Sequence, residues 1–222
     1  MGRPREFDER AVLAAAGETF WSKGYEATST RDLAASTGLT ASSIYAAFGD
    51  KRGLYLRALD QYLNDVLRER ISRLEASLSP GQAVAGYFAG VIDRSLADPH
   101  HRGCMLVNTA LEATENNPDI QRIVADETIT LESFFERCIV DGRQTGEIAT
   151  DQDAGELARH LLSVALGLRV LARVRPDREL FEGLVRPALA MLGLPPLPAR
   201  ADTVNSKASN KRNPTRKKKE TP

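Results

Sequence analysis

Hydrophobic residues recur at helical spacing through almost the whole chain up to Gly193. In the first segment, residues 8–23, Leu13, Ala16 and Phe20 fall at i, i+3 and i+7 and form one apolar face. Gly24 follows, at the position where a left-handed residue ends many helices. Alternating β-branched runs bounded by turn dipeptides, which predict hairpins, are missing. The pattern predicts an all-α protein.

Capping residues and helix breakers predict the boundaries of the helices that follow. Hydroxyl side chains at Thr28–Thr30 and Thr40 can cap two short helices, and Asp50 can cap a longer one that runs towards Leu74. Ser79-Pro80 places proline in the first turn of the next helix. The helices predicted from these signals cover residues 28–36, 41–48, 51–74, 80 onward, 104–116, 119–145, 153–174 and 177–192.

The two short helices are spaced as a helix-turn-helix. This motif needs a small residue in its first helix, a glycine in the turn and a buried aliphatic residue in its second helix. Ala34, Gly38 and Ile44 meet these needs at spacings of +4 and +6, with Leu33 and Leu39 as further core positions. The alternative is an ordinary helical hairpin with no role in binding DNA.

The stretch TSTRDLAASTGLTASSIYAAFGDKRGLYLRAL, preceded by FWSKGYEA, resembles the DNA-binding domain of the TetR (tetracycline-repressor-like) family of transcription regulators. The match includes Gly24-Tyr25, Thr28, the pattern Ile44-Tyr45-x-x-Phe48, and Lys51. It covers residues 6 to 60 closely. The resemblance implies a homodimer that binds operator DNA and releases it when a small molecule occupies the C-terminal domain.

The resemblance also implies the domain organisation. We expect a three-helix helix-turn-helix domain at residues 6–53, a helical effector-binding and dimerisation domain at 54–193, and a disordered basic tail at 199–222. The prolines of Leu194–Pro198 cannot continue a helix. The tail has one valine and no aromatic residue, so it cannot bury enough apolar surface to fold.

The candidate DNA-contacting residues lie on and around the second short helix. Its first turn is the part that a helix-turn-helix presents to the major groove, while Ile44 and Phe48 should face inward. Because alanine and serine offer little bidentate readout, we expect methyl contacts, water and DNA shape to contribute to sequence preference. The candidates for the groove are Thr40, Ala41, Ser42, Tyr45 and Ala46, and those for phosphates are Thr28, Tyr45 and Lys51.

An effector pocket and a dimer interface are predicted further along the chain. Four leucines and Val164 repeat at spacings of 4 and 3 along residues 157–171 beside a second apolar stripe, so this helix needs two partners. The candidate interface comprises Leu157, Leu161, Val164, Leu168, Leu171, Leu184 and Ala188; the alternative is packing within one chain. The candidate pocket residues, which could equally be plain core, are Phe88, Cys104, Met105, Asn108, Leu111 and Phe134.

Composition and charge restrict the class of protein. The 222 residues are 42% hydrophobic and 27% charged, which is typical of a folded globular chain. The formal net charge of zero hides a tail of eight Lys/Arg and two Asp/Glu, a net of +6, so residues 1–199 sum to −6. Residues 1–67 carry eight basic and nine acidic residues, so net charge alone does not favour DNA binding.

Two cysteines, no leader and no membrane-length apolar run predict a cytoplasmic protein.

No pattern in the sequence favours catalysis, a cofactor or a metal. Gly-rich phosphate loops, Ser/His/Asp arrangements and HExxH are missing. His100-His101-x-x-Cys104 lacks the second cluster that a tetrahedral metal site requires. Cys104 could sense oxidants or electrophiles at a helix N-terminus, although a buried core cysteine is the simpler interpretation.

These observations favour a homodimeric repressor that a small molecule releases from a palindromic operator. One alternative is an architectural DNA-binding protein without an effector, and another is a cysteine-based sensor of the same fold. A third is a helical lipid-binding or enzymatic protein in which the hairpin is incidental.

Overall fold

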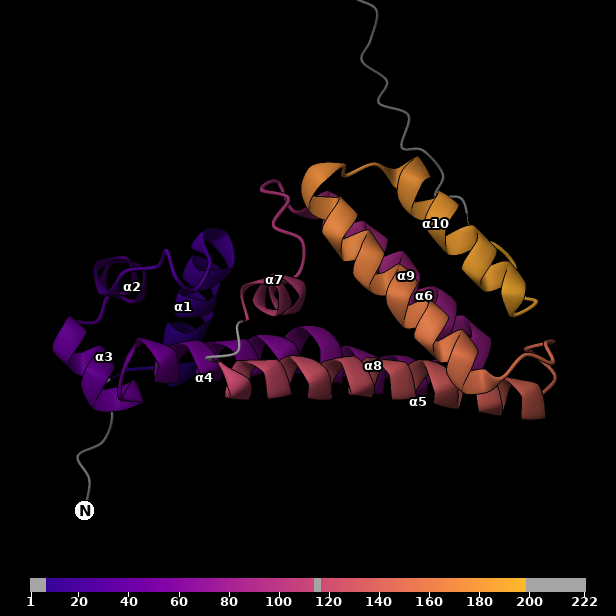
Figure 1. The fold of residues 1–222 in the computed structure, drawn as a ribbon, viewed down its shortest axis with the longest axis horizontal. Coiled ribbons are helices and arrows are strands. Elements are labelled where there is room, and N and C mark those ends of the chain that lie inside the picture. Colours follow the sequence, from indigo (N-terminus) through magenta and orange to yellow (C-terminus); the bar gives the residue numbers. More distant parts are fainter. Residues whose placement is uncertain (1–6, 114–116, 199–222) are drawn as a thin grey trace, which may run out of the picture.

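The computed structural model describes residues 7–113 and 117–198, and within these ranges the chain forms helices and loops without a strand (Figure 1). The all-α prediction is therefore confirmed. The helices are α1 (Glu9–Lys23), α2 (Thr30–Thr37), α3 (Ala41–Phe48), α4 (Lys51–Leu63), the π-helical segment η1 (Asn64–Arg68), α5 (Glu69–Ser77), α6 (Pro80–Ala97), α7 (Met105–Glu112), α8 (Pro118–Gln144), α9 (Ala154–Val174) and α10 (Arg178–Met191). The end of the predicted helix at residue 116 and the tail at 199–222 lie outside the described residues.

Side-chain caps set the starts of the N-terminal helices. Ser29 and Asp32 form a capping box at α2, Thr40 accepts from the Ser43 amide at α3, and Asp50 accepts from the Gly53 amide at α4. Each cap pairs one of the amides that the first turn of a helix leaves without a partner. Gly38 ends α2 at φ 71°, in the left-handed region that glycine enters without a steric penalty.

The long helix that begins at Lys51 differs from its prediction. It was expected to be one α-helix to Leu74, but it reaches Ser77 and changes to π-helical geometry at η1. A π-turn holds one extra residue and displaces the helix face that follows it. The hydrophobic pattern carries no signal for this change, because buried Leu63 and Leu67 are also spaced as in a regular α-helix.

An N-terminal core joins α1 to α4. Phe20, Leu33, Ile44 and Leu54 are buried in it, and the Phe20 and Tyr55 rings meet edge to face at 4.9 Å between centroids. The start of α7 belongs to the same core: Cys104, Met105, Leu106 and Val107 are buried there. The helix-turn-helix part therefore packs directly against an element of the C-terminal part.

Helix α8 runs beside the long helix made by α4, η1 and α5 (Figure 1). Three arginine–carboxylate pairs join the two, and their residue numbers rise together along both helices, so the helices run in the same direction. The pairs are Arg52–Asp119, Arg68–Glu127 and Arg137–Glu75.

A C-terminal core lies between α6, α8, α9 and α10. Tyr87, Phe88, Phe134 and Phe135 form an aromatic group at its centre, and the Phe88 and Phe135 rings stack at 5.6 Å between centroids. All four side chains are buried. This core holds the C-terminal helices together.

Replacing Phe135 by alanine should lower the free energy of unfolding by about 3–5 kcal/mol, because it leaves a cavity in a close-packed core. Denaturant unfolding at a fixed protein concentration measures the change. Exposed Ala76 on α5, replaced by serine, is the control and should change the free energy by less than about 0.5 kcal/mol. A loss below about 1 kcal/mol for Phe135→Ala would show that the aromatic group contributes little.

Candidate functional site

The exposed face of α3 is the most distinctive surface of the N-terminal part. Ala41, Ser42, Tyr45 and Ala46 are exposed, while Ile44 and Phe48 on the opposite side are buried. The inward orientation predicted for Ile44 and Phe48 is confirmed. The exposed side chains are small apart from Tyr45, so the α3 backbone can approach another surface closely.

Contacts with neighbouring residues orient the α3 side chains. The Thr40 hydroxyl lies 2.9 Å from the Ser42 hydroxyl and also accepts from the Ser43 amide. The Tyr45 hydroxyl is 3.0 Å from the Thr30 hydroxyl on α2. Thr40, Ser42 and Tyr45 thus present hydroxyl groups on one exposed surface.

The side chains of Lys51 and Thr28 lie in different environments in the structure. The Lys51 ammonium donates to the Glu26 carbonyl at 3.2 Å and lies 4.6 Å from the centroid of the Tyr25 ring, so it is held beside the turn after α1. Thr28 is only 1% exposed, and its hydroxyl donates to the Gly24 carbonyl at 2.6 Å. The prediction that Thr28 contacts a phosphate is wrong in this conformation, because the side chain closes the turn instead.

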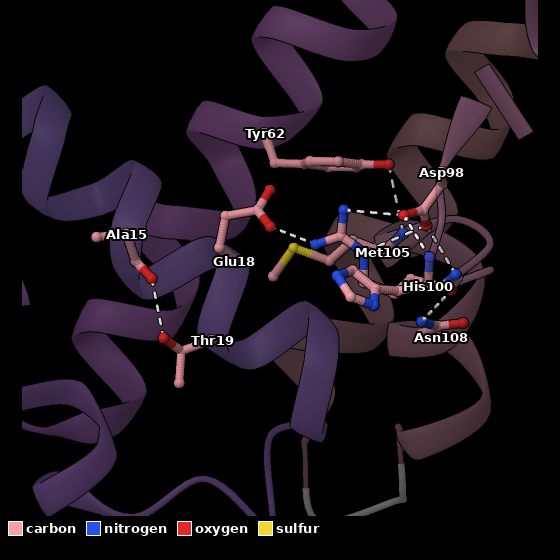
Figure 2. Close-up of polar contacts among 9 residues, drawn as sticks. Ala15, Glu18, Thr19, Tyr62, Asp98, His100, Met105 and Asn108 are labelled. Carbon is pink, nitrogen blue, oxygen red and sulfur yellow. Dashed lines mark hydrogen bonds and ion pairs between the residues drawn. The ribbon is translucent and has the colours of Figure 1, made fainter. Parts of the chain in front are cut away.

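Arg102 links the C-terminal part to α1 through its contacts with Glu18 and Asp98, two residues labelled in Figure 2. Its guanidinium pairs with Glu18 on α1 and with Asp98 at the end of α6, and it lies 4.0 Å from the centroid of the Trp21 ring. Burial works against the charge of Asp98, but its hydrogen bonds with Arg102 lower its pKa overall. The loop before α7 is therefore tied to the helix-turn-helix part through one cation.

Helix α7 makes two further polar contacts with the N-terminal part. The Tyr55 and Thr109 hydroxyls lie 2.7 Å apart in a buried position, and the Tyr25 amide donates to the Glu112 carboxylate at 2.8 Å. Burial raises the pKa of Tyr55 to about 12, so its phenol stays neutral. Movement of α7 would disturb α4 and the turn after α1 together.

A small, partly open cavity of about 30 Å³ lies where α4, η1, α6, α7, α8 and α9 meet. Its polar groups come from Tyr62, Tyr87, Cys104 and Arg169. The Tyr62 hydroxyl donates to the Cys104 sulfur at 3.7 Å and accepts from the Met105 amide at 3.4 Å, a contact visible in Figure 2. The rest of the wall is apolar: Leu63, Val66, Leu67, Leu106, Val107, Leu131, Ala165 and Leu166.

Of the six residues predicted to line an effector pocket, Cys104 lies on the wall of this cavity. Phe88 and Phe134 are buried in the C-terminal core, and Met105 is buried in the N-terminal core. Asn108 donates to the Arg102 carbonyl at 3.1 Å and accepts from Arg173 at 2.8 Å, so it is a structural link. Leu111 is 73% exposed and was wrongly assigned to a pocket.

Sequence reasoning missed Tyr62, Tyr87 and Arg169 as cavity residues. A signal for Arg169 was present, since this arginine interrupts an apolar stripe between Ala165 and Ala172. Arg169 is 8% exposed in the structure.

The predicted dimer interface also needs correction. Leu157, Leu161, Leu168 and Ala188 are buried in the C-terminal core of the same chain, so they are not free to meet a second copy. The other three, Val164, Leu171 and Leu184, are half-buried. The exposed positions of α9 and α10 include small and branched residues, Ser163, Gly167, Val170, Val174, Gly183, Pro187 and Ala190, beside the polar and charged residues Glu156, Arg159, His160, Arg173, Glu179 and Arg186.

The described residues form neither a metal site nor a membrane span. Residues 7–113 and 117–198 contain no group of three or more His, Cys, Asp or Glu side chains placed to hold a metal ion. Within the same part of the chain, every helix is too short or too polar to cross a membrane.

Comparisons with known families match both parts of the chain. Residues 12–58 match bacterial regulatory proteins of the tetR family, and residues 80–187 match the tetracyclin repressor-like C-terminal domain. The chain is 33% identical to the uncharacterized HTH-type transcriptional regulator YezE of Bacillus subtilis (strain 168), over 86% of this chain and all of YezE. It is 31% identical to the HTH-type transcriptional repressor ComR of Escherichia coli (strain K12), over 78% of this chain and 82% of ComR.

A solved structure similar to this chain contains DNA. It is a cysteine mutant of the TetR family transcriptional regulator CifR complexed with 26-base-pair double-strand operator DNA. The TM-score is 0.76, and the identity is 33% over 86% of this chain and all of the CifR chain.

Proposed function

Because this chain belongs to the TetR family of transcriptional regulators, we propose that it is a homodimeric repressor that a small molecule releases from a palindromic operator. The observation that carries this proposal is the exposed α3 face of small and hydroxyl-bearing side chains, backed by buried Ile44 and Phe48. A helix of this kind fits the major groove, where serine and threonine hydroxyls meet base edges and alanine methyl groups meet thymine. The CifR complex with operator DNA supports the same role.

Two copies would pair through the exposed face of α9 and α10. Gly167 and Gly183 have open space where a Cβ atom would lie, so two helices can approach closely at these positions. Val170 and Val174 beside them are 44% and 76% exposed, which leaves apolar area for a partner to cover. Such a dimer would place two α3 helices for half-sites about 34 Å apart, or a multiple of that distance.

The contacts around α7 provide a route from the cavity to α3. Tyr62 joins the cavity wall to the Met105 amide, Thr109 holds Tyr55 on α4, and Arg102 holds Glu18 on α1. A small molecule that widens the cavity would displace α7 and α4 and change the separation of the two α3 helices. Release follows if the ligand binds this DNA-incompatible arrangement more tightly.

Lys51→Ala should weaken binding to all DNA sequences alike and reduce the salt slope by about one unit, because it removes one phosphate contact. Affinity for operator and random DNA across a salt series measures this. Arg73→Ala on exposed α5 is the control and should leave both affinities unchanged. If the salt slope does not change, the phosphate contact is assigned to the wrong residue.

The alternative function is that of an architectural DNA-binding protein without an effector. It predicts similar affinity for a palindrome and for random DNA, whereas the repressor predicts a large preference for one palindrome.

A further inference from the structure

Arg169 is a buried cation on the wall of a mostly apolar cavity. Arg169 is 8% exposed, and the described residues that line the cavity include no Asp or Glu. Arginine keeps its charge in proteins, and a buried charge is costly unless it is paired. The position therefore favours an anionic partner supplied from outside the chain.

The two phenols on the cavity wall are neutral. Burial raises the pKa of Tyr62 and of Tyr87, so both phenols keep their protons at neutral pH. Burial by itself lowers the pKa of Arg169, but its neighbours Cys104, Tyr87 and Tyr62 raise it overall. Arg169 hydrogen-bonds the Tyr87 hydroxyl and Tyr62 donates to Cys104, so Arg169 and the Tyr87 proton are the groups of this wall that can bind an anion.

The rest of the wall is hydrocarbon. Leu63, Val66 and Leu131 face the same space, so the remainder of a ligand would lie against apolar side chains. Two of the wall residues, Val66 and Leu67, belong to the π-helical segment η1. Single π-turns are common at functional sites, and here the turn lies in the helix that leads directly to the helix-turn-helix part.

We propose that the cavity binds the carboxylate of a small amphipathic acid, with Arg169 pairing with the carboxylate and Leu63, Val66 and Leu131 contacting its hydrocarbon. This assignment rests on the proposed effector role of the cavity. The cavity of about 30 Å³ holds about two water molecules. An acid larger than two water molecules must therefore displace residues of the wall. Entry of the ligand is therefore coupled to movement of η1 and α7.

Butyrate and its uncharged counterpart butyramide test the charge requirement directly. Thermal unfolding and calorimetry of the full chain, without DNA, should show that butyrate binds and butyramide binds about tenfold more weakly or not at all. Arg169→Met should lower butyrate affinity by about tenfold or more, and Arg169→Lys should retain part of it. Arg73→Met on exposed α5, away from the cavity wall and from the α9 face, is the matched control and should bind as the parent does. Equal binding of acid and amide, or full binding by a folded Arg169→Met protein, would overturn the proposal.

A second measurement on the parent chain keeps the test valid if Arg169→Met does not fold. Iodoacetate carries a carboxylate and iodoacetamide does not. With either reagent the Cys104 sulfur attacks the CH2 carbon, iodide leaves, and the thiol proton passes to solvent. If Arg169 binds the carboxylate, the rate ratio of iodoacetate to iodoacetamide at Cys104 should exceed that of free glutathione by about tenfold, and butyrate should suppress it.

Cys138 is the internal control for this labelling. It is buried in the C-terminal core, away from the cavity wall, and burial and Glu75 raise the pKa of its thiol to about 12. It should show no preference for iodoacetate. A Cys104 ratio equal to that of glutathione would overturn the proposal.

The operator assay separates this proposal from the proposed function. Butyrate binding that depends on Arg169 supports the anion site whether or not DNA is released. If such binding leaves operator affinity unchanged, the site stands and the effector role of the cavity is contradicted.

Discussion

A Gly167→Arg variant should be monomeric and should bind operator DNA about a hundredfold or more weakly than the parent. Gly167 lies on the exposed face of α9 with open space at its Cβ position, so a single protomer accommodates the new side chain. A second copy approaching that face would not, since arginine would hold the helices apart and bury an unpaired charge. Loss of the dimer removes the second half-site contact and with it the gain from bivalent binding.

Light scattering should give a mass near 24.3 kDa for this variant and twice that for the parent. Circular dichroism checks that the variant keeps its helical fold. Ala76→Arg on exposed α5 introduces the same charge away from this face and should stay dimeric. A dimeric Gly167→Arg protein with parental operator affinity would place the interface elsewhere.

A Ser42→Glu variant should lose operator affinity by about a hundredfold or more while remaining folded and dimeric. Ser42 is exposed in the first turn of α3, where a carboxylate is compatible with the helix dipole and so does not destabilise the helix. In the major groove the same carboxylate would face negative phosphates and acceptor-rich base edges.

Titration of labelled operator at fixed salt measures the affinity. Two further serine variants complete this test. Ser72→Glu on exposed α5 adds an equal charge elsewhere and should bind as the parent does. Ser42→Ala should change which sequences are preferred more than it changes overall affinity. Parental operator affinity for Ser42→Glu would show that α3 does not enter the groove.

The helix-turn-helix part could be predicted from the sequence because its signals are local. Ala34, Gly38 and Ile44 lie within eleven residues of one another, and the roles of the capping Thr40 and the buried Phe48 follow from helical periodicity. Thr28 was misassigned because a hydroxyl beside a helix end can contact either an external partner or its own backbone. Sequence spacing does not distinguish the two.

The surface of α9 could not be assigned because its apolar stripes are broad. Leu157, Leu161 and Leu168 gave the strongest hydrophobic signal. Because their side chains are large and apolar, they pack in the core of their own chain. The face left exposed contains Ser163 and Gly167, which carry no hydrophobic signal. A prediction of an interface from the spacing of apolar residues therefore identifies the residues of the chain's own core before those of an interface.

The cavity and its links depend on contacts between distant segments. Tyr62, Tyr87 and Arg169 come from α4, α6 and α9, and meet only when these helices pack together. The contact of Arg102 with Glu18 spans 84 residues. Such contacts are consequences of the packed fold, and one sequence does not determine them by local rules.

Selection of bound sequences from random double-strand DNA by the full-length protein tests the central claim most directly. A homodimer that reads DNA through two α3 helices should enrich an inverted repeat whose half-sites are about 34 Å apart, or a multiple of it. The Ser42→Glu protein, taken through the same selection, should enrich no such repeat. Enrichment of no common sequence by the parent, or of the same repeat by Ser42→Glu, would contradict the account.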